Sequence, residues 1–187
     1  GIQKGQAIFS MDASFQVKEP GLHHQIERQP VPEPEALEDD RQVALRMTDL
    51  GPHGPWMTRE RPFQMRSIVP IDQAPTPKTN QAVWIKFSAP ILDVTTQQQL
   101  LAYASDMGIL STCTLPHGKS FLTGLMTASL DHAMWFHRPF RFDEWILFEQ
   151  DSPAAGGARG FNRGSMFTEA GLLIASVAQE GLIREID

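Results

Sequence analysis

The sequence has 187 residues, of which 41% are hydrophobic and 20% charged, and its formal net charge is −6 at pH 7. A chain of this length can bury one sizeable core. Its net negative charge argues against a nucleic-acid-binding surface, which needs clustered Lys and Arg. No apolar run is long enough to span a bilayer, so we expect neither a nucleic-acid nor a membrane partner. The single cysteine, Cys113, excludes an intrachain disulfide and is compatible with a reducing compartment.

The N-terminal part of the sequence reads as a strand followed by a linker. The sequence begins at Gly1 rather than Met, and residues 6–17 alternate strictly between apolar and polar side chains, which is typical of a half-buried strand. A lone strand is not stable, so we expect it to pair outside the following domain, as the end of something longer. Residues 18–62 are rich in proline and predict an extended surface linker with little regular structure, apart from a short helix within 37–50.

A globular domain is predicted for residues 63–187. It contains one clear helix, over residues 96–107, which Asp93 or Thr95 can cap and Gly108 can end. The apolar residues of this helix follow the i, i+3, i+4, i+7 spacing: Leu100, Tyr103, Ala104 and Met107. That spacing predicts a single buried stripe.

The rest of this domain is predicted to be strands. They cover residues 63–70, 82–87, 124–130, 145–151, 160–168 and 172–184. Residues 169–171 read as a hairpin turn, and the segment after residue 130 reads as an aromatic turn closed by Pro139. One helix and a run of antiparallel strands predict an α+β fold, with an antiparallel sheet wrapped around the helix.

Three polar side chains lie at unexpected positions in this pattern. Asp106 falls in the last helical turn, where a carboxylate faces the negative end of the helix dipole at a cost of about 0.3–1 kcal/mol when exposed. Ser129 interrupts an apolar strand, and Gln179 shares a strand face with Leu173, Ala175 and Val177. Each alone also fits a structural role: a solvated carboxylate, a core serine bonded to backbone, or an amide bonded between strands. Together, a carboxylate, a hydroxyl and an amide suffice to hold and activate one water.

Other polar residues are weaker candidates. Cys113 is a potential nucleophile, but it sits in a polar loop without an obvious activating partner, which favours an incidental thiol. The glycine-rich residues 156–160 lack the context of a phosphate loop and favour a hairpin connection. Arg159 and Arg163 suit either the phosphates of a ligand or simple solvation, and solvation is the safer interpretation.

The histidines His132 and His137 flank an aromatic triplet, with Asp131 next to them, and raise the question of a metal site. Their spacing in an extended segment sends the two side chains to opposite faces, and no HExxH or CxxC pattern supports a metal. Hydrogen-bonded structural histidines are the favoured interpretation.

Five segments carry a family resemblance, in the order LLAYASDMGIL, PHG, ASLDHAMWFHRPF, ARGFNRG and GLLIASVAQEGLIR. They resemble the acyl-CoA thioesterase II family, whose members are double hot-dog hydrolases, and the resemblance runs from about residue 5 to residue 184. It implies that residues 1–17 are the last strand of a truncated N-terminal hot-dog domain, 18–62 a linker, and 63–187 the C-terminal hot-dog domain.

The resemblance also implies an activity and its residues. The family's catalytic positions carry over to Asp106, Ser129 and Gln179, which we expect within reach of one water, beside an apolar cavity. The implied reaction hydrolyses a fatty acyl-CoA to free acid and CoA without metal or organic cofactor.

The implied partner is a second copy of the chain or the missing N-terminal domain. The ending REID differs from the small-basic-leucine ending of peroxisomal members and favours a cytoplasmic enzyme. Two alternatives stay open. One is a hot-dog enoyl-CoA hydratase that uses Asp131 with His132 or His137. The other is a non-catalytic half that binds acyl-CoA or mediates oligomerisation.

Overall fold

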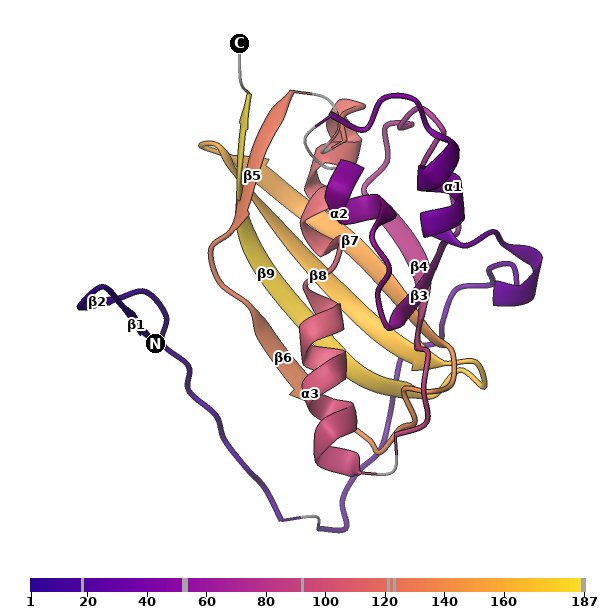
Figure 1. Ribbon diagram of the computed structural model, residues 1–187. Helices are drawn as coiled ribbons and strands as arrows, with labels where there is room; N and C mark the ends of the chain where they lie inside the picture. The colour runs from indigo at the N-terminus through magenta and orange to yellow at the C-terminus, as the bar shows by residue number, and fades with distance from the viewer. Residues whose placement is uncertain (18, 52–53, 92, 121, 123, 186–187) are drawn as a thin grey trace.

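The computed structural model describes residues 1–17, 19–51, 54–91, 93–120, 122 and 124–185. Most of these residues surround one antiparallel sheet of seven strands (Figure 1). Its strands are β3 (Phe63–Ser67), β4 (Asn80–Phe87), β5 (Leu125–Ser129), β6 (Ala133–Phe136), β7 (Ile146–Gly156), β8 (Arg159–Thr168) and β9 (Leu173–Glu185). Their order is β3-β4-β7-β8-β9-β5, and β6 also pairs with β9. The expected α+β architecture is confirmed.

Both predicted hairpin connections are present. Gly171, in the turn between β8 and β9, has a φ of 80°, which glycine adopts without a steric penalty. The strands β7 and β8 are joined at Gly157 and Ala158, as the glycine-rich run predicts. These turns let β7, β8 and β9 follow one another as neighbours in the sheet.

The helix α3 (Val94–Ser105) packs against one face of this sheet (Figure 1). Asp93 caps it by accepting a hydrogen bond from the Thr96 amide at 2.6 Å, and Asp106 is the residue that follows its last turn. The predicted stripe is confirmed for Leu100, which packs on the main core, and for Ala104 and Met107, which are buried, but it is wrong for Tyr103, which is 57% exposed. The buried side chains of α3 are Gln97, Leu101, Ala104 and Ser105. The small Ala104 and Ser105 let the end of the helix approach the sheet closely.

The main core fills the space between α3 and the inner face of the sheet. Its buried members come from β4, β7, β8 and β9, from α3, from the 3₁₀ helix that begins at Ile109, and from the loops between them: Val83, Ile85, Ile91, Leu101, Ala104, Ile109, Phe142, Ile146, Phe148, Met166, Ile174, Ala175 and Val177. The predicted two faces of β4 are confirmed, since Trp84 belongs to a second cluster on the outer face. Leu173 packs in that outer cluster too, so it does not share the inner face with Gln179 as predicted. A register shift in β9 next to Leu173 accounts for this.

Two elements of the domain are not predicted from the sequence. Residues expected to be a polar loop form the 3₁₀ helix η3 (Ile109–His117), which buries Cys113 and Thr114. Thr114 Oγ1 donates to the Ser111 carbonyl at 2.7 Å, and Cys113 Sγ to the Leu110 carbonyl at 3.0 Å. These local bonds satisfy polar groups that look suited to solvent. The expected aromatic turn after residue 130 contains the strand β6 instead.

The expectation of a linker with little regular structure over residues 18–62 is corrected by the structure. Its described residues contain the 3₁₀ helix η1 (Pro34–Ala36) and the helices α1 (Asp40–Arg46) and α2 (Gly54–Thr58). The predicted helix within 37–50 is thus confirmed as α1. The segment before α1 covers the outer face of the sheet, while α1 and α2 form a third cluster with Leu50.

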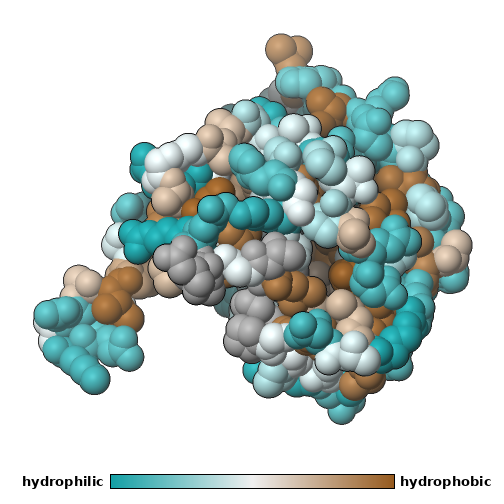
Figure 2. Space-filling model, turned by 90° about the horizontal axis from the view of Figure 1, so that it is seen from above, coloured by the Kyte–Doolittle hydropathy of each residue, from teal (hydrophilic) through white to brown (hydrophobic). Residues whose placement is uncertain are grey.

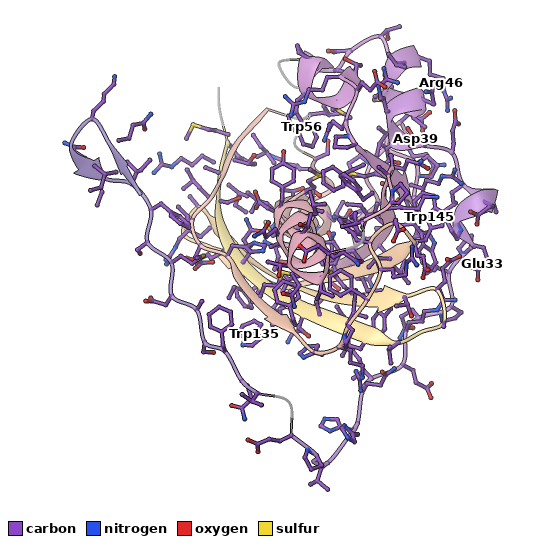
Figure 3. All side chains as sticks on the ribbon, turned by 60° about the horizontal axis from the view of Figure 1, so that its bottom comes forward. Glu33, Asp39, Arg46, Trp56, Trp135 and Trp145 are labelled. Atoms are coloured by element: carbon purple, nitrogen blue, oxygen red, sulfur yellow. The ribbon has the colours of Figure 1, made fainter. Side chains whose placement is uncertain are left out.

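Tryptophan side chains attach this segment to the outer face. Trp84 Nε1 donates to the Pro32 carbonyl at 2.9 Å, and Trp145 Nε1 donates to Glu35 Oε1 at 3.0 Å. Figure 3 shows Trp145 and Glu33 toward the same side of the molecule, away from Trp135. Proline favours such an extended covering strip because its ring fixes φ and it has no N–H to bury. Much of the expected linker therefore packs against the domain.

Of the predicted strand over residues 6–17, only Gln6–Ala7 is a strand in this chain, and its pairing with a missing domain or a second copy stays a prediction. Only β1 (Ile2–Gln3) and β2 (Gln6–Ala7) pair, as a small hairpin that projects from the body of the molecule (Figure 2). Beyond it, Phe15 is 94% and Val17 82% exposed. Alternating sequence makes a strand only where an edge is present to pair with, and no described strand offers one here. Among the described residues, no helix is both long and apolar enough to cross a membrane.

Candidate active site

The site forms where the edge of the sheet is interrupted. The strands β5 and β6 pair with successive parts of β9, and between them both Leu130 and Asp131 direct their amides to the Glu180 carbonyl. Ser129 lies opposite Gly181 and Ala133 opposite Ala178, so Ser129 and His132 flank Gln179. The interruption thus places the side chains of Ser129 and His132 next to that of Gln179 on β9.

All three predicted site residues converge at this point. Asp106 Oδ1 accepts a hydrogen bond from Ser129 Oγ at 3.0 Å and one from Gln179 Nε2 at 2.6 Å. Asp106 comes from the end of α3, Ser129 from the end of β5 and Gln179 from the middle of β9. The fold therefore brings together residues that lie far apart in the sequence.

The three residues differ in how far solvent reaches them. Gln179 is fully buried, whereas Asp106 and Ser129 are exposed. A buried amide needs partners for its polar atoms, and Gln179 finds one in Asp106. The carboxylate itself stays accessible to water, and both of its described donors bond to the same oxygen, Oδ1. Among the described contacts, Oδ2 is left for a water molecule.

His132 joins the site, although the sequence favours a structural role for it. Its Nε2 lies 2.8 Å from Ser105 Oγ and its Nδ1 lies 3.4 Å from Gln179 Oε1. Ser105, the last residue of α3, is fully buried and is not predicted as a site residue. The sequence signal that could have identified Ser105 is its position directly before Asp106, within the YASD segment.

The other candidates serve different purposes. Asp131 Oδ1 accepts from the Glu180 amide at 2.7 Å, and the described contacts include no bond from Asp131 to either histidine. The paired His and Asp that a hydratase needs is therefore not formed. His137 points to the other face, where its Nε2 lies 2.8 Å from Ser176 Oγ, and burial and Arg138 lower its pKa. The predicted separation of the two histidines is confirmed.

The remaining candidates are structural. Burial raises the pKa of the Cys113 thiol, which disfavours the thiolate that a nucleophile needs. Arg159 pairs with Glu180, and Arg163 with Asp151, at the surface. In the described part of the chain, no group of three or more His, Cys, Asp or Glu side chains is arranged to hold a metal ion.

A cavity of about 700 Å³ reaches the junction between α3 and η3. It is lined by β3 and β4, by the α1 and α2 segment, and by Met107 and Gly108, which follow Asp106. Asp106, Ser129 and Gln179 are not part of its lining. The expectation of an apolar cavity directly beside the three polar groups is therefore wrong for this cavity.

Comparison with known proteins identifies the family. The model of the acyl-CoA thioesterase family matches residues 59–182. This chain belongs to the acyl-CoA thioesterase family. Acyl-coenzyme A thioesterase 8 of Rattus norvegicus is 37% identical to it over 196 residues, which cover 98% of this chain and 61% of that protein. Acyl-CoA thioesterase 2 of Haemophilus influenzae is 38% identical over 190 residues, which cover 98% of this chain and 66% of that protein.

Solved structures agree with this membership. The crystal structure of the acyl-CoA thioesterase II TesB2 from Mycobacterium marinum is 38% identical, with a TM-score of 0.78, and the match covers all of this chain and 66% of that one. A hot-dog protein of unknown function from Alicyclobacillus acidocaldarius has a TM-score of 0.63 at 13% identity, which bears on the fold alone. The hot-dog fold is confirmed. The chain spans less than two thirds of the length of the relatives it matches here.

Proposed function

We propose that this chain is the part of an acyl-CoA thioesterase that carries its hydrolytic centre, with Asp106, Ser129 and Gln179 as the catalytic residues. The observation that carries the proposal is the convergence of Ser129 Oγ and Gln179 Nε2 on one oxygen of Asp106. Two donors from separate strands are held on one accessible carboxylate at the end of α3. That arrangement is what activation of a single water requires.

The proposed reaction begins with a water bound to Oδ2 of Asp106. The carboxylate takes one proton from this water, and the water oxygen attacks the carbonyl carbon of the thioester. The tetrahedral intermediate collapses, the carbon–sulfur bond breaks, and the CoA thiolate takes back the proton from Asp106. The products are a carboxylic acid, ionised at neutral pH, and CoA.

Ser129 and Gln179 orient this water. The Ser129 hydroxyl donates to Asp106 and keeps lone pairs that can accept from the water. The amide nitrogen of Gln179 has two hydrogens, and only one of them is used by Asp106 among the described contacts. Gln179 is fully buried in this chain, so the second can donate to the thioester oxygen only when a bound substrate reaches the amide, as negative charge develops on that oxygen.

The substrate we propose is a fatty acyl-CoA, with no metal or organic cofactor in the reaction. The names of the relatives support an acyl-CoA substrate. We further propose that residues 1–17 complete an N-terminal hot-dog domain, and that this domain or a second copy of the chain covers the open site. The open position of Asp106 and Ser129 supports such a cover. A cytoplasmic location is part of the same proposal.

A thiol-release assay with acyl-CoAs of increasing chain length tests this function. It is run on this chain and on a longer enzyme that includes the proposed N-terminal domain. The longer enzyme is expected to release CoA, and Asp106→Asn is expected to lower its turnover by roughly 10²–10⁴-fold, because the amide cannot take a proton. Asp151→Asn, a surface carboxylate on β7, is the control. Wild-type turnover in Asp106→Asn contradicts the proposal.

The two alternatives give different results in the same experiments. A hydratase consumes an enoyl-CoA without releasing thiol and is insensitive to Asp106→Asn. If this chain is a non-catalytic half, it binds acyl-CoA without releasing thiol, and Asp106→Asn leaves the turnover of the longer enzyme unchanged. The structural observation against the hydratase is the bond from the Glu180 amide to Asp131.

A further inference from the structure

His132 connects two fully buried polar residues of the site. Its Nε2 lies 2.8 Å from Ser105 Oγ, and its Nδ1 lies 3.4 Å from Oε1 of Gln179. Ser105 and Gln179 are both 0% exposed. A network that ties together buried polar groups is retained only where each hydrogen has an acceptor. The positions of the hydrogens can therefore be worked out.

The orientation of the Gln179 amide follows from its neighbour. Its nitrogen lies 2.6 Å from Asp106 Oδ1, and a carboxylate only accepts hydrogen bonds. A rotated amide would place Oε1 against that carboxylate, with two acceptors in contact. The nitrogen therefore faces Asp106, and Oε1 faces His132.

The hydrogen on His132 follows in turn. Gln179 Oε1 is an acceptor, so Nδ1 must carry the hydrogen that it receives. Ser105 Oγ lies 2.7 Å from the Ala102 carbonyl and 2.8 Å from Nε2. If Ser105 donates to the carbonyl, the ring is charged and donates through both nitrogens; if it donates to Nε2, the ring is neutral. Nδ1 carries a hydrogen in both cases.

We propose that His132 is a positioning residue for Gln179, a role that rests on the proposed function. The Nδ1–H group holds Oε1 and so keeps the amide nitrogen directed at Asp106. Ser105 holds the ring from its other nitrogen. Without His132, Oε1 of Gln179 has no described partner. The amide can then rotate about the last bond of the side chain, which turns Oε1 instead of the nitrogen toward the Asp106 carboxylate. Gln179 then orients the water less well.

The chain contains a matched control on the opposite face. His137 makes the same kind of bond, from Nε2 to Ser176 Oγ at 2.8 Å. It comes from the same segment but contacts none of the three catalytic residues among the described contacts. His137→Ala therefore removes a histidine–serine bond without touching Gln179.

The test measures kcat and KM for thiol release in the longer enzyme. His132→Ala is expected to lower kcat by about 10–100-fold, as loss of an orienting partner does, with KM changed by less than about twofold because ground-state binding is kept. His132→Asn, whose amide nitrogen can take the place of Nδ1, is expected to restore most of kcat. Ser105→Ala lowers kcat in the same way but less, and His137→Ala leaves both constants unchanged.

A double variant separates positioning from direct action. In the Gln179→Ala background, His132→Ala is expected to have no further effect on kcat. If it lowers kcat by the same factor there, His132 acts on the substrate and the inference is overturned. The inference is also overturned if Asp106→Asn abolishes turnover while His132→Ala and Ser105→Ala leave kcat unchanged.

The controls keep the two proposals distinguishable. If Asp106→Asn keeps wild-type turnover, it is the proposed function that fails. If His132→Ala unfolds, as judged by its thermal midpoint, Ser105→Ala replaces it, since this substitution removes only one hydroxyl. The kcat of Ser105→Ala is then compared in the wild-type and the Gln179→Ala background. A loss of kcat that persists without Gln179 again overturns the inference.

Discussion

Gln179 is a polar residue at a fully buried position. It is 0% exposed, on the strand that also supplies Ala175 and Val177 to the core. An unpaired amide there would cost roughly 1–3 kcal/mol. Asp106 and His132 provide its partners, so its place in the core depends on the site. Together with the bond from Ser129 to Asp106, the bond from Gln179 to Asp106 ties the three proposed catalytic residues into one unit.

This unit predicts non-additive effects on catalysis. Ser129→Ala and Gln179→Ala are each expected to lower thiol release by about 10²-fold, by analogy with loss of one oriented donor. Combined with Asp106→Asn, they are expected to add little, because all three act on the same water. The measurement is kcat for single and double variants of the longer enzyme. Fully multiplicative losses would show that the residues act separately.

At the scale of elements, η3 packs closely on β8 because Gly160 has no side chain. A Cβ added at Gly160 would lie 2.2 Å from Cys113 Sγ and 2.5 Å from Cys113 Cβ. Real atoms do not approach so closely, so η3 or β8 would have to move. Cys113 thus has a packing role, and Gly160 is the position that permits it.

Gly160→Ala is therefore expected to lower the free energy of unfolding by about 1–3 kcal/mol, the usual effect of overpacking. Urea denaturation followed by circular dichroism measures it. Gly156→Ala is the matched control in the same hairpin, because an added Cβ there meets nothing within 4 Å. Equal effects of the two substitutions would contradict the proposed contact.

A second link between elements joins α1 to β3. Asp40 accepts from the Ser67 amide at 2.8 Å and from Ser67 Oγ at 2.7 Å. Burial raises the pKa of Asp40 from 3.8 to about 6, against the opposing effect of the two Ser67 bonds. Between about pH 4 and pH 6 the folded state therefore holds more protons than the unfolded state. This contribution stabilises the fold below that window and is lost as the pH rises through it.

Asp40→Asn is expected to remove this pH dependence, since its amide can still bond to both groups of Ser67. The free energy of unfolding of the variant, relative to wild type, should rise by about 1–3 kcal/mol between pH 4 and pH 7. Ser67→Ala removes one bond that stabilises the Asp40 carboxylate. It should therefore raise the pKa of Asp40 and move the pH dependence of stability to higher pH. Urea titrations at a series of pH values measure both. A difference that stays constant with pH contradicts the prediction.

On the scale of the whole molecule, residues 8–17 differ from the predicted linker that follows them in how much of each is packed against the domain. Residues 8–17 have no regular structure, and their large apolar side chains are exposed. By contrast, Val43 and Ala44 in α1 are 1% exposed and Trp84 is bonded to Pro32. The boundary of the packed unit therefore lies before residue 25, where Gln25 bonds to Gly171 and Leu173.

Limited proteolysis of this chain is expected to follow that boundary. Cleavage by chymotrypsin should begin within residues 8–17, because unfolded, exposed backbone is the preferred substrate. Residues 40–58 should resist at the same protease concentration. Mass spectrometry of the first fragments identifies the sites. First cleavage within α1 or α2 would show that this segment is not part of the packed unit.

The sequence by itself determined the class of fold and the identities of the three proposed site residues. Strand alternation, the cap at Asp93 and the hairpin glycines are local signals, and local sterics decide them. Asp106 and Gln179 stood out because their polarity conflicted with their positions, and the family resemblance gave them roles.

Only the tertiary structure decided which side chains and segments contact Gln179, Trp84 and Trp145. His132 contacts Gln179 because β5 and β6 meet β9 on either side of an interruption, a consequence of strand pairing across many residues. The covering of Trp84 and Trp145 by a proline-rich strip depends likewise on the outer face of a sheet that the local sequence does not contain. Residues 6–17 show the converse: their alternation is that of a strand, but a strand forms only where another edge completes its hydrogen bonds.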